Sequence, residues 1–240
     1  MAFLDRIADA ARTLKPDGLL GRLAYAVLGE SAMAGGGEGR DPTKATGFTI
    51  AVIALSAKMA KADGVVTRDE VAAFRQVFDF PQAEMHHVAR MFDLARQDVA
   101  GFDLYARDVR RILRGDAALL EDVLHGLFYI AQADGIMHEN ELLYLEAVSE
   151  IFKLDPKVFA RLCAIYVPGD DGVDPYAVLG VAPDADDTTI KNAWRALARE
   201  NHPDALIARG VPEEFIRQAG QKLAAINDAY DHIKQARGLS

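Results

Sequence analysis

Apolar residues recur every three or four positions along most of this chain, the spacing that places side chains on one face of a helix. An alternating pattern of the kind that predicts strands is not found. Between residues 48 and 166 the pattern predicts amphipathic helices over roughly 48–62, 67–79, 82–97, 103–114, 116–133, 138–153 and 155–166. The predicted fold class is therefore all-α: a helical bundle followed by a smaller helical hairpin.

Two stretches interrupt the helical pattern and divide the chain. The first is rich in Gly, Ser, Pro and charge, includes the run Gly35–Gly37, and reads as a flexible linker. The second, Val167–Pro175, concentrates Gly, Pro and Asp and marks a domain boundary. The resulting division is an N-terminal amphipathic helical segment (1–30), a linker (31–47), a helical domain (48–166), a linker (167–173) and a C-terminal domain (174–240).

The helical domain contains an internal repeat. MAKADGVVTRDE at Met59–Glu70 aligns without gaps with IAQADGIMHENE at Ile130–Glu141. Each copy ends an apolar helix, turns at Asp-Gly and opens a new helix, so helix capping alone accounts for the motif. If the two turns lie side by side, their carboxylates also form an oxygen-rich site for a hard divalent cation such as calcium. The candidate metal ligands are Asp63, Glu70, Asp134 and Glu141.

This duplicated ADG turn followed by a glutamate resembles the TerB family of tellurite-resistance proteins, over roughly residues 47–166. The resemblance implies a helical bundle with a shared acidic surface that binds metal in some members. It implies no catalytic group.

The C-terminal domain begins with a short helix over Pro175–Leu179, capped by Asp174 and closed by Gly180. A second helix starts at about Asp187, and a long third helix starts near Pro212. The apolar seams of these two helices predict an antiparallel hairpin. Because a residue before proline is pushed out of the helical region, the second helix must end by about Asn201. His202, Pro203 and Asp204 are then expected in an exposed loop between the helices.

Three cations recur every four residues on the second helix, opposite its apolar face: Lys191, Arg195 and Arg199. They form a local positive patch in a chain whose formal net charge is −9. A solvated helix face is the simpler interpretation of this stripe, and a docking surface for an acidic partner is the functional one.

The segments DPYAVLGV, TTIKNAWRALARENHPD and AINDAYDHIK together resemble a J domain, the DnaJ co-chaperone module, and the order of the two domains resembles the DjlA-type proteins. The resemblance implies that His202, Pro203 and Asp204 contact the ATPase domain of a DnaK-type chaperone, with Lys191, Arg195 and Arg199 supplying electrostatic docking. The sequence departs from the usual J-domain pattern at Trp194, Glu200, Asn201 and Ala205.

Composition narrows the remaining function classes. The excess of 36 acidic over 27 basic residues disfavours nucleic-acid binding. No apolar stretch approaches the roughly 20 residues of a membrane-spanning helix. The single cysteine, Cys163, lies among apolar residues and reads as a small buried hydrophobe. No nucleophile, metal triad or phosphate loop accompanies His202, so the protein is expected not to be an enzyme.

Two functions follow as hypotheses. In the first, the chain is a J-domain co-chaperone that stimulates the ATPase of a DnaK-type chaperone, needs no cofactor, and uses its TerB-like domain to select a client, a location or an ion. In the second, it is a metal-sensing TerB-like scaffold or stress-response protein with a non-productive J domain. The expected location is the cytoplasm, or alternatively the periphery of the inner membrane. The sequence identifies neither the client protein nor the oligomeric state.

Overall fold

The computed structural model describes residue 23, residues 42–62, 85–98, 101–133, 135–167, 169, 172–211 and 213–238. Every regular element in these ranges is a helix, and the one β-type pairing among them is an isolated bridge between Gly169 and Gly172. The all-α prediction is confirmed. No helix in the described ranges is both long and apolar enough to cross a bilayer.

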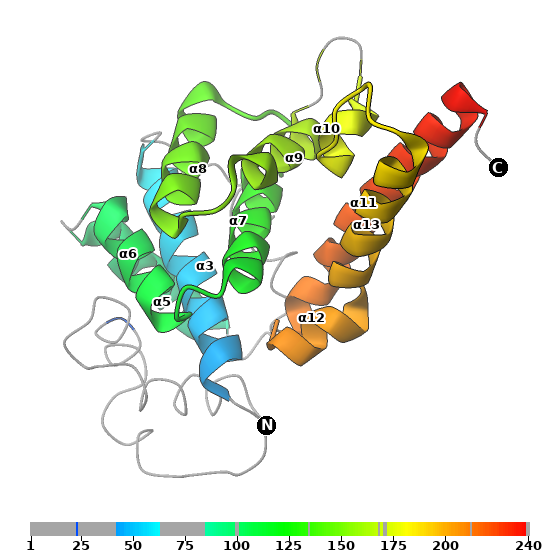
Figure 1. The fold of residues 1–240 in the computed structure, drawn as a ribbon. Helices are drawn as coiled ribbons and strands as arrows, with labels where there is room; N and C mark the ends of the chain where they lie inside the picture. Colours follow the sequence, from blue (N-terminus) through cyan, green and yellow to red (C-terminus); the bar gives the residue numbers. More distant parts are fainter. Residues whose placement is uncertain are drawn as a thin grey trace.

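A helical bundle forms the first part of the structure (Figure 1). Its central helix, α3, contacts α5, α6, α7 and α8. Almost every side chain of α3 from Phe48 to Ala60 is buried, as expected for a helix covered on all sides. The bundle comprises α3 (Pro42–Ala62), α5 (Met85–Gln97), α6 (Phe102–Ile112), α7 (Ala117–Ala131), α8 (Glu139–Phe152) and α9 (Pro156–Tyr166).

The C-terminal domain follows as four helices, seen in yellow to red in Figure 1: α10 (Pro175–Leu179), α11 (Asp187–Glu200), α12 (Pro203–Arg209) and α13 (Glu213–Arg237). Aspartates begin two of them, since the Asp174 carboxylate accepts the N–H groups of Tyr176 and Ala177, and the Asp186 carboxylate accepts that of Thr189. These local caps define where each helix starts.

Helices α11 and α13 pack against each other as the hairpin prediction requires. The Trp194 ring stacks on Tyr230 with ring centroids 4.2 Å apart, and the Trp194 indole N–H donates to Asn227 Oδ1 at 2.9 Å. Trp194 packs against an apolar core formed by Val178, Leu179, Ile190, Leu197, Ile226, Ala229, Tyr230 and Ile233. The domain therefore has a hydrophobic core of its own.

The C-terminal domain also packs directly on the bundle. Leu206, Val211, Phe215 and Ala219 belong to the same buried cluster as the bundle core. The Phe215 ring meets Phe48 edge to face with centroids 4.7 Å apart. It also lies over Gly126 of α7, where an added Cβ would come within 3.4 Å of the ring. A glycine inside α7 thus makes room for an aromatic side chain of the other domain.

Two boundaries differ from the sequence predictions. Helix α3 begins at Pro42, so residues 42–47 of the predicted linker are helical. Proline is favoured in the first turn of a helix, where its missing N–H costs no hydrogen bond. The segment His202–Gly210, predicted as a loop, contains the helix α12. The predicted helix over 67–79 and nearly all of the predicted helical segment 1–30 lie outside the described residues.

Candidate functional site

His202 is the N-cap of α12 rather than a loop residue. Its ring Nδ1 accepts the backbone N–H of Asp204 at 3.2 Å, and Pro203 occupies the first helical position. The side chains of His202 and Asp204 are 57% and 89% exposed. The three predicted docking residues therefore lie together at a rigid helix start, with the imidazole and the carboxylate open to solvent.

Buried side chains and hydrogen bonds hold the backbone around this helix start in place. The Asn201 side chain is buried and donates from Nδ2 to the Leu197 carbonyl at 2.8 Å. The Arg209 guanidinium donates from Nη1 to the Glu200 carbonyl at 2.8 Å. Buried Leu206 fixes the opposite face of α12. Asn201, a departure from the usual J-domain pattern, thus closes the end of α11.

The cationic stripe runs along the outer face of α11. Arg195 and Arg199 are exposed and Lys191 is half-buried. None of the three forms an ion pair with another residue of the described chain. Arg199 lies three positions before His202, so this positive charge leads directly to the exposed histidine and aspartate.

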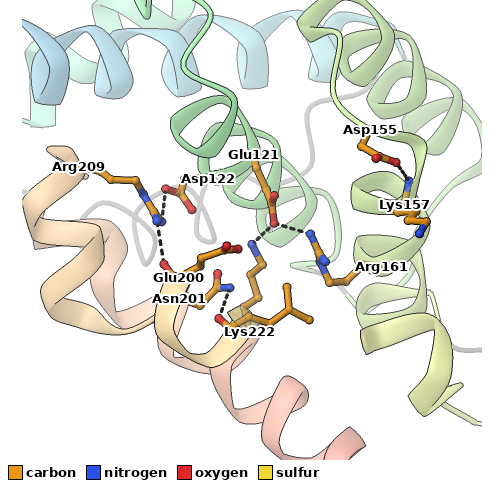
Figure 2. Close-up of polar contacts among 10 residues, drawn as sticks. Glu121, Asp122, Asp155, Lys157, Arg161, Glu200, Asn201, Arg209 and Lys222 are labelled. Atoms are coloured by element: carbon orange, nitrogen blue, oxygen red, sulfur yellow. Dashed lines mark hydrogen bonds and ion pairs between the residues drawn. The ribbon is translucent and has the colours of Figure 1, made fainter. Parts of the chain in front are cut away.

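A buried cluster of charges joins the C-terminal domain to the bundle (Figure 2). Glu121 of α7 accepts Lys222 of α13 at 2.6 Å and Arg161 of α9 at 3.0 Å, both at Oε1. The neighbouring Asp122 accepts Arg209 of α12 at 2.9 Å. The Lys222 side chain is only 1% exposed. Two adjacent carboxylates of one bundle helix thus bind two helices of the other domain.

Burial and charge act differently on the two carboxylates. Burial alone would raise the pKa of Glu121, but Lys222 and Arg161 outweigh it and lower that pKa to about 2. For Asp122, burial dominates over Lys222 and Arg209 and raises the pKa to about 6. Glu121 is therefore ionised throughout the physiological range, whereas Asp122 can take up a proton in mildly acidic conditions.

A buried histidine lies one turn further along α7. Burial, and secondarily the charge of Lys222, lowers the pKa of His125 to about 3. His125 Nε2 is 2.6 Å from the Tyr166 hydroxyl. The two side chains are hydrogen-bonded, with the tautomer of the neutral imidazole setting which one donates, and the pair packs as part of the core. His125 is therefore a structural residue of the core.

Of the four predicted metal ligands, the structure describes Glu141. Asp63, Glu70 and Asp134 lie outside the described residues. Glu141 is 2% exposed, and its Oε2 accepts the backbone N–H of His138 at 3.0 Å at the start of α8. His138 is the N-cap of α8. No group of three metal-binding side chains occurs among the described residues, and the cation site stays a prediction.

Cys163 is half-buried on α9, and burial raises the pKa of its thiol to about 11. A thiol with a raised pKa is mostly protonated at neutral pH and is a poor nucleophile. The sequence interpretation of this residue as a packing residue therefore fits its surroundings.

No local sequence pattern predicts that Arg161, Arg209 and Lys222 lie in the interface between the domains. Each one reads as an ordinary surface charge in its helix. Their partners lie 40, 87 and 101 positions away in the chain, so no local pattern reveals the pairing.

Comparison with known families matches both domains. Residues 49–164 match the family described as tellurite resistance protein TerB, and residues 174–237 match the DnaJ domain. The exposed His-Pro-Asp segment at the start of α12 lies inside the second match. The chain is thus a J-domain protein with a preceding TerB domain.

Curated relatives align with this chain over most of their length. The co-chaperone protein DjlA of Photobacterium profundum is 31% identical over 219 residues, covering 80% of this chain and 78% of the relative. The DjlA proteins of Escherichia coli K12 and Coxiella burnetii are each 28% identical, over 75% of this chain. The chain belongs to the DjlA family of co-chaperones. No solved structure is significantly similar to it.

Proposed function

We propose that this protein stimulates the ATPase of a DnaK-type chaperone through His202, Pro203 and Asp204. The observation that carries the proposal is the exposure of His202 and Asp204 at a capped helix start, beside the exposed cations Arg195 and Arg199. Membership of the DjlA co-chaperone family supports the same role.

The cationic stripe would meet an acidic surface of the partner. Complementary charge speeds encounter and fixes orientation, and exposed charges act mainly on the rate of association. The His-Pro-Asp segment would then bind one conformation of the partner better than the other and shift it toward hydrolysis. The bond-breaking chemistry belongs to the partner, so this chain acts as a regulator and not as an enzyme.

The TerB-like domain is proposed to select a client, a location or an ion. The chain has one cysteine and therefore no CxxC repeat of the kind that general DnaJ proteins use for clients. The helices of the bundle would have to supply that selection. The proposed location is the cytoplasm or the membrane periphery.

The proposal is tested by measuring steady-state ATP hydrolysis of a DnaK-type chaperone with increasing amounts of the full chain. His202→Gln is the matched variant, because the side chain is exposed and its replacement leaves no cavity, and a melting temperature measured for each protein accounts for the changed cap contact with the Asp204 N–H. We expect the wild-type chain to raise turnover and His202→Gln to fail at equal concentration. A wild-type chain that leaves turnover unchanged would overturn the proposal and favour the metal-sensing scaffold.

A further inference from the structure

Arg209 links the bundle to the backbone just before His202. One terminal nitrogen, Nη2, donates to Asp122 of α7 at 2.9 Å, and the other, Nη1, donates to the Glu200 carbonyl at 2.8 Å. Glu200 is the last residue of α11, and Arg209 is the last residue of α12. A single planar guanidinium therefore holds α11, which ends just before His202, and α12, which begins at Pro203, against one bundle carboxylate (Figure 2).

A second ionic contact restrains the neighbouring helix. Lys222 of α13 reaches Glu121, which Arg161 of α9 also binds. Apolar packing, such as that of Phe215 on Phe48, resists separation but tolerates sliding. Charge-assisted hydrogen bonds in a buried site tolerate little displacement, because an unpaired buried charge is costly. Together the two acids define the orientation of the C-terminal domain and not merely its attachment.

The interface does not cover the candidate docking face. His202 and Asp204 stay exposed while Arg209 is bound to Asp122, and so do Arg195 and Arg199. An autoinhibitory contact would bury these side chains. The contact instead supports the corner of α11 and α12 from the side opposite to the solvent.

We propose that Asp122 of the TerB-like domain is a positioning residue for the His-Pro-Asp segment and acts on it through Arg209. The bundle and the J domain then meet the partner chaperone as one rigid unit. This inference rests on the proposed function, because it assigns a remote residue to the same docking event. It adds that a side chain of the TerB-like domain, outside the docking face itself, controls how well that face engages.

The test uses the full chain in four forms: wild type, Asp122→Asn, Arg209→Met and the double variant. Asp122→Asn keeps the shape of the side chain but removes its charge. We expect either single change to raise the co-chaperone concentration needed for half-maximal ATPase stimulation by about two- to tenfold. We expect the double variant to need the same half-maximal concentration as Arg209→Met alone, since both changes break the same contact between Asp122 and Arg209.

Asp108→Asn is the matched control. Asp108 is also a mostly buried bundle aspartate paired with an arginine, Arg111, but it lies on α6. At a temperature where all variants are folded, Asp108→Asn should leave the half-maximal concentration unchanged. An Asp122→Asn variant that matches the wild type, equal effects of Asp108→Asn, or additive effects in the double variant would each overturn the inference.

A readout without the partner separates this inference from the proposed function. The ring signals of His202, assigned by their loss in His202→Gln, are followed by NMR in the isolated full chain. We expect Asp122→Asn to shift these signals and Asp108→Asn to leave them in place. If the wild type fails to stimulate any ATPase while the shift occurs, the proposed function fails and the positional link stands. Unchanged His202 signals in Asp122→Asn would overturn the link.

Discussion

Arg209 of the J domain forms an ion pair with Asp122 of the TerB-like domain at 2.9 Å, although 87 positions separate them in the chain. The Arg209 side chain is 21% exposed and that of Asp122 8%, so the pair is largely removed from water. Screening by salt is weak for such a pair, and its geometry is correspondingly specific. The two domains are therefore joined by directional contacts as well as by apolar packing.

Lys222→Met should destabilise the folded chain by about 3 kcal/mol, because it removes one partner of a buried ion pair. Glu121 keeps Arg161, which moderates the loss. The measurement is urea denaturation followed by far-UV circular dichroism. A double change, Glu121→Gln with Lys222→Met, should not recover the loss, since it leaves the buried Arg161 without its carboxylate. A single variant as stable as the wild type would contradict the buried pairing.

The chain contains one tryptophan, so tryptophan fluorescence reports on the J domain alone. Trp194 is stacked on Tyr230 in that domain, whereas circular dichroism reports on all helices. Because the domains share a buried interface, we expect both signals to give one coincident urea transition in the wild type. Lys222→Met should separate the two transitions. Separate transitions in the wild type would show that the domains unfold independently.

Stability should respond to the ionisation of Asp122 in a defined pH window. The pKa of this carboxyl is about 6 in the folded chain against an ordinary value of 3.8, because burial disfavours the charge. Between these values the Asp122 carboxyl binds more protons in the folded chain than in the unfolded chain, so its contribution to stability rises as pH falls, by up to about 1.4 kcal/mol per pH unit.

Ionisation of Glu121 changes stability in the opposite direction, and it does so at lower pH than that of Asp122. Its folded pKa is about 2 against 4.5, so its contribution is present above pH 4.5 and is lost only as pH falls further. His125 also contributes in this window, because its folded pKa is about 3 against an ordinary 6.5, and it lowers stability as pH falls. Asp122→Asn keeps His125, so the difference between the wild type and this variant from pH 4.5 to 6 isolates Asp122. We expect Asp122→Asn to remove that part of the slope when free energies of unfolding are compared across the window. Parallel profiles for the two proteins would contradict the raised pKa.

The cation hypothesis can be tested at Glu141, the one candidate ligand that the structure describes. The hypothesis predicts that calcium chloride raises the melting temperature of the wild-type chain, and that Glu141→Ala abolishes this rise. Glu141→Ala should also cost about 1 kcal/mol without calcium, because it removes the acceptor of the His138 N–H. Calorimetric titration of the wild type that shows no calcium binding would contradict the hypothesis.

Helix periodicity was sufficient to predict the architecture. The predicted ranges 116–133 and 138–153 enclose α7 and α8, and Asp174 begins α10 as its position before a proline indicates. The same rule, applied to His202 before Pro203, would have predicted the start of α12. The loop prediction for His202 follows from the other effect of Pro203, since a proline also ends the preceding helix.

The sequence alone does not predict the interface between the domains. Glu121 and Asp122 read as two ordinary charges in an amphipathic helix, and Lys222 as an exposed cation in a long one. Their burial depends on how two independently predictable domains dock, which local spacing does not encode. Asn201 is a similar case, since its departure from the usual pattern acquires a reason only from its buried hydrogen bond to Leu197.

The cationic stripe should act through association. Replacing Arg195 and Arg199 by alanine is expected to raise the concentration of the chain needed for half-maximal stimulation of the partner, with little effect on the maximal rate. The effect should shrink as sodium chloride is increased from 0.05 to 0.3 M, about the range where screening of exposed charges becomes strong. Thermal unfolding serves as the control, because both side chains are exposed. A salt-independent effect would argue against electrostatic docking.

The most direct measurement is single-turnover ATP hydrolysis by a DnaK-type chaperone, loaded with labelled ATP and mixed with the intact chain. The account predicts faster hydrolysis with the wild type, and the unstimulated rate with His202→Gln at the same melting temperature. Equal rates with and without the wild-type chain, or equal stimulation by both proteins, would contradict the role assigned to the exposed helix start at His202.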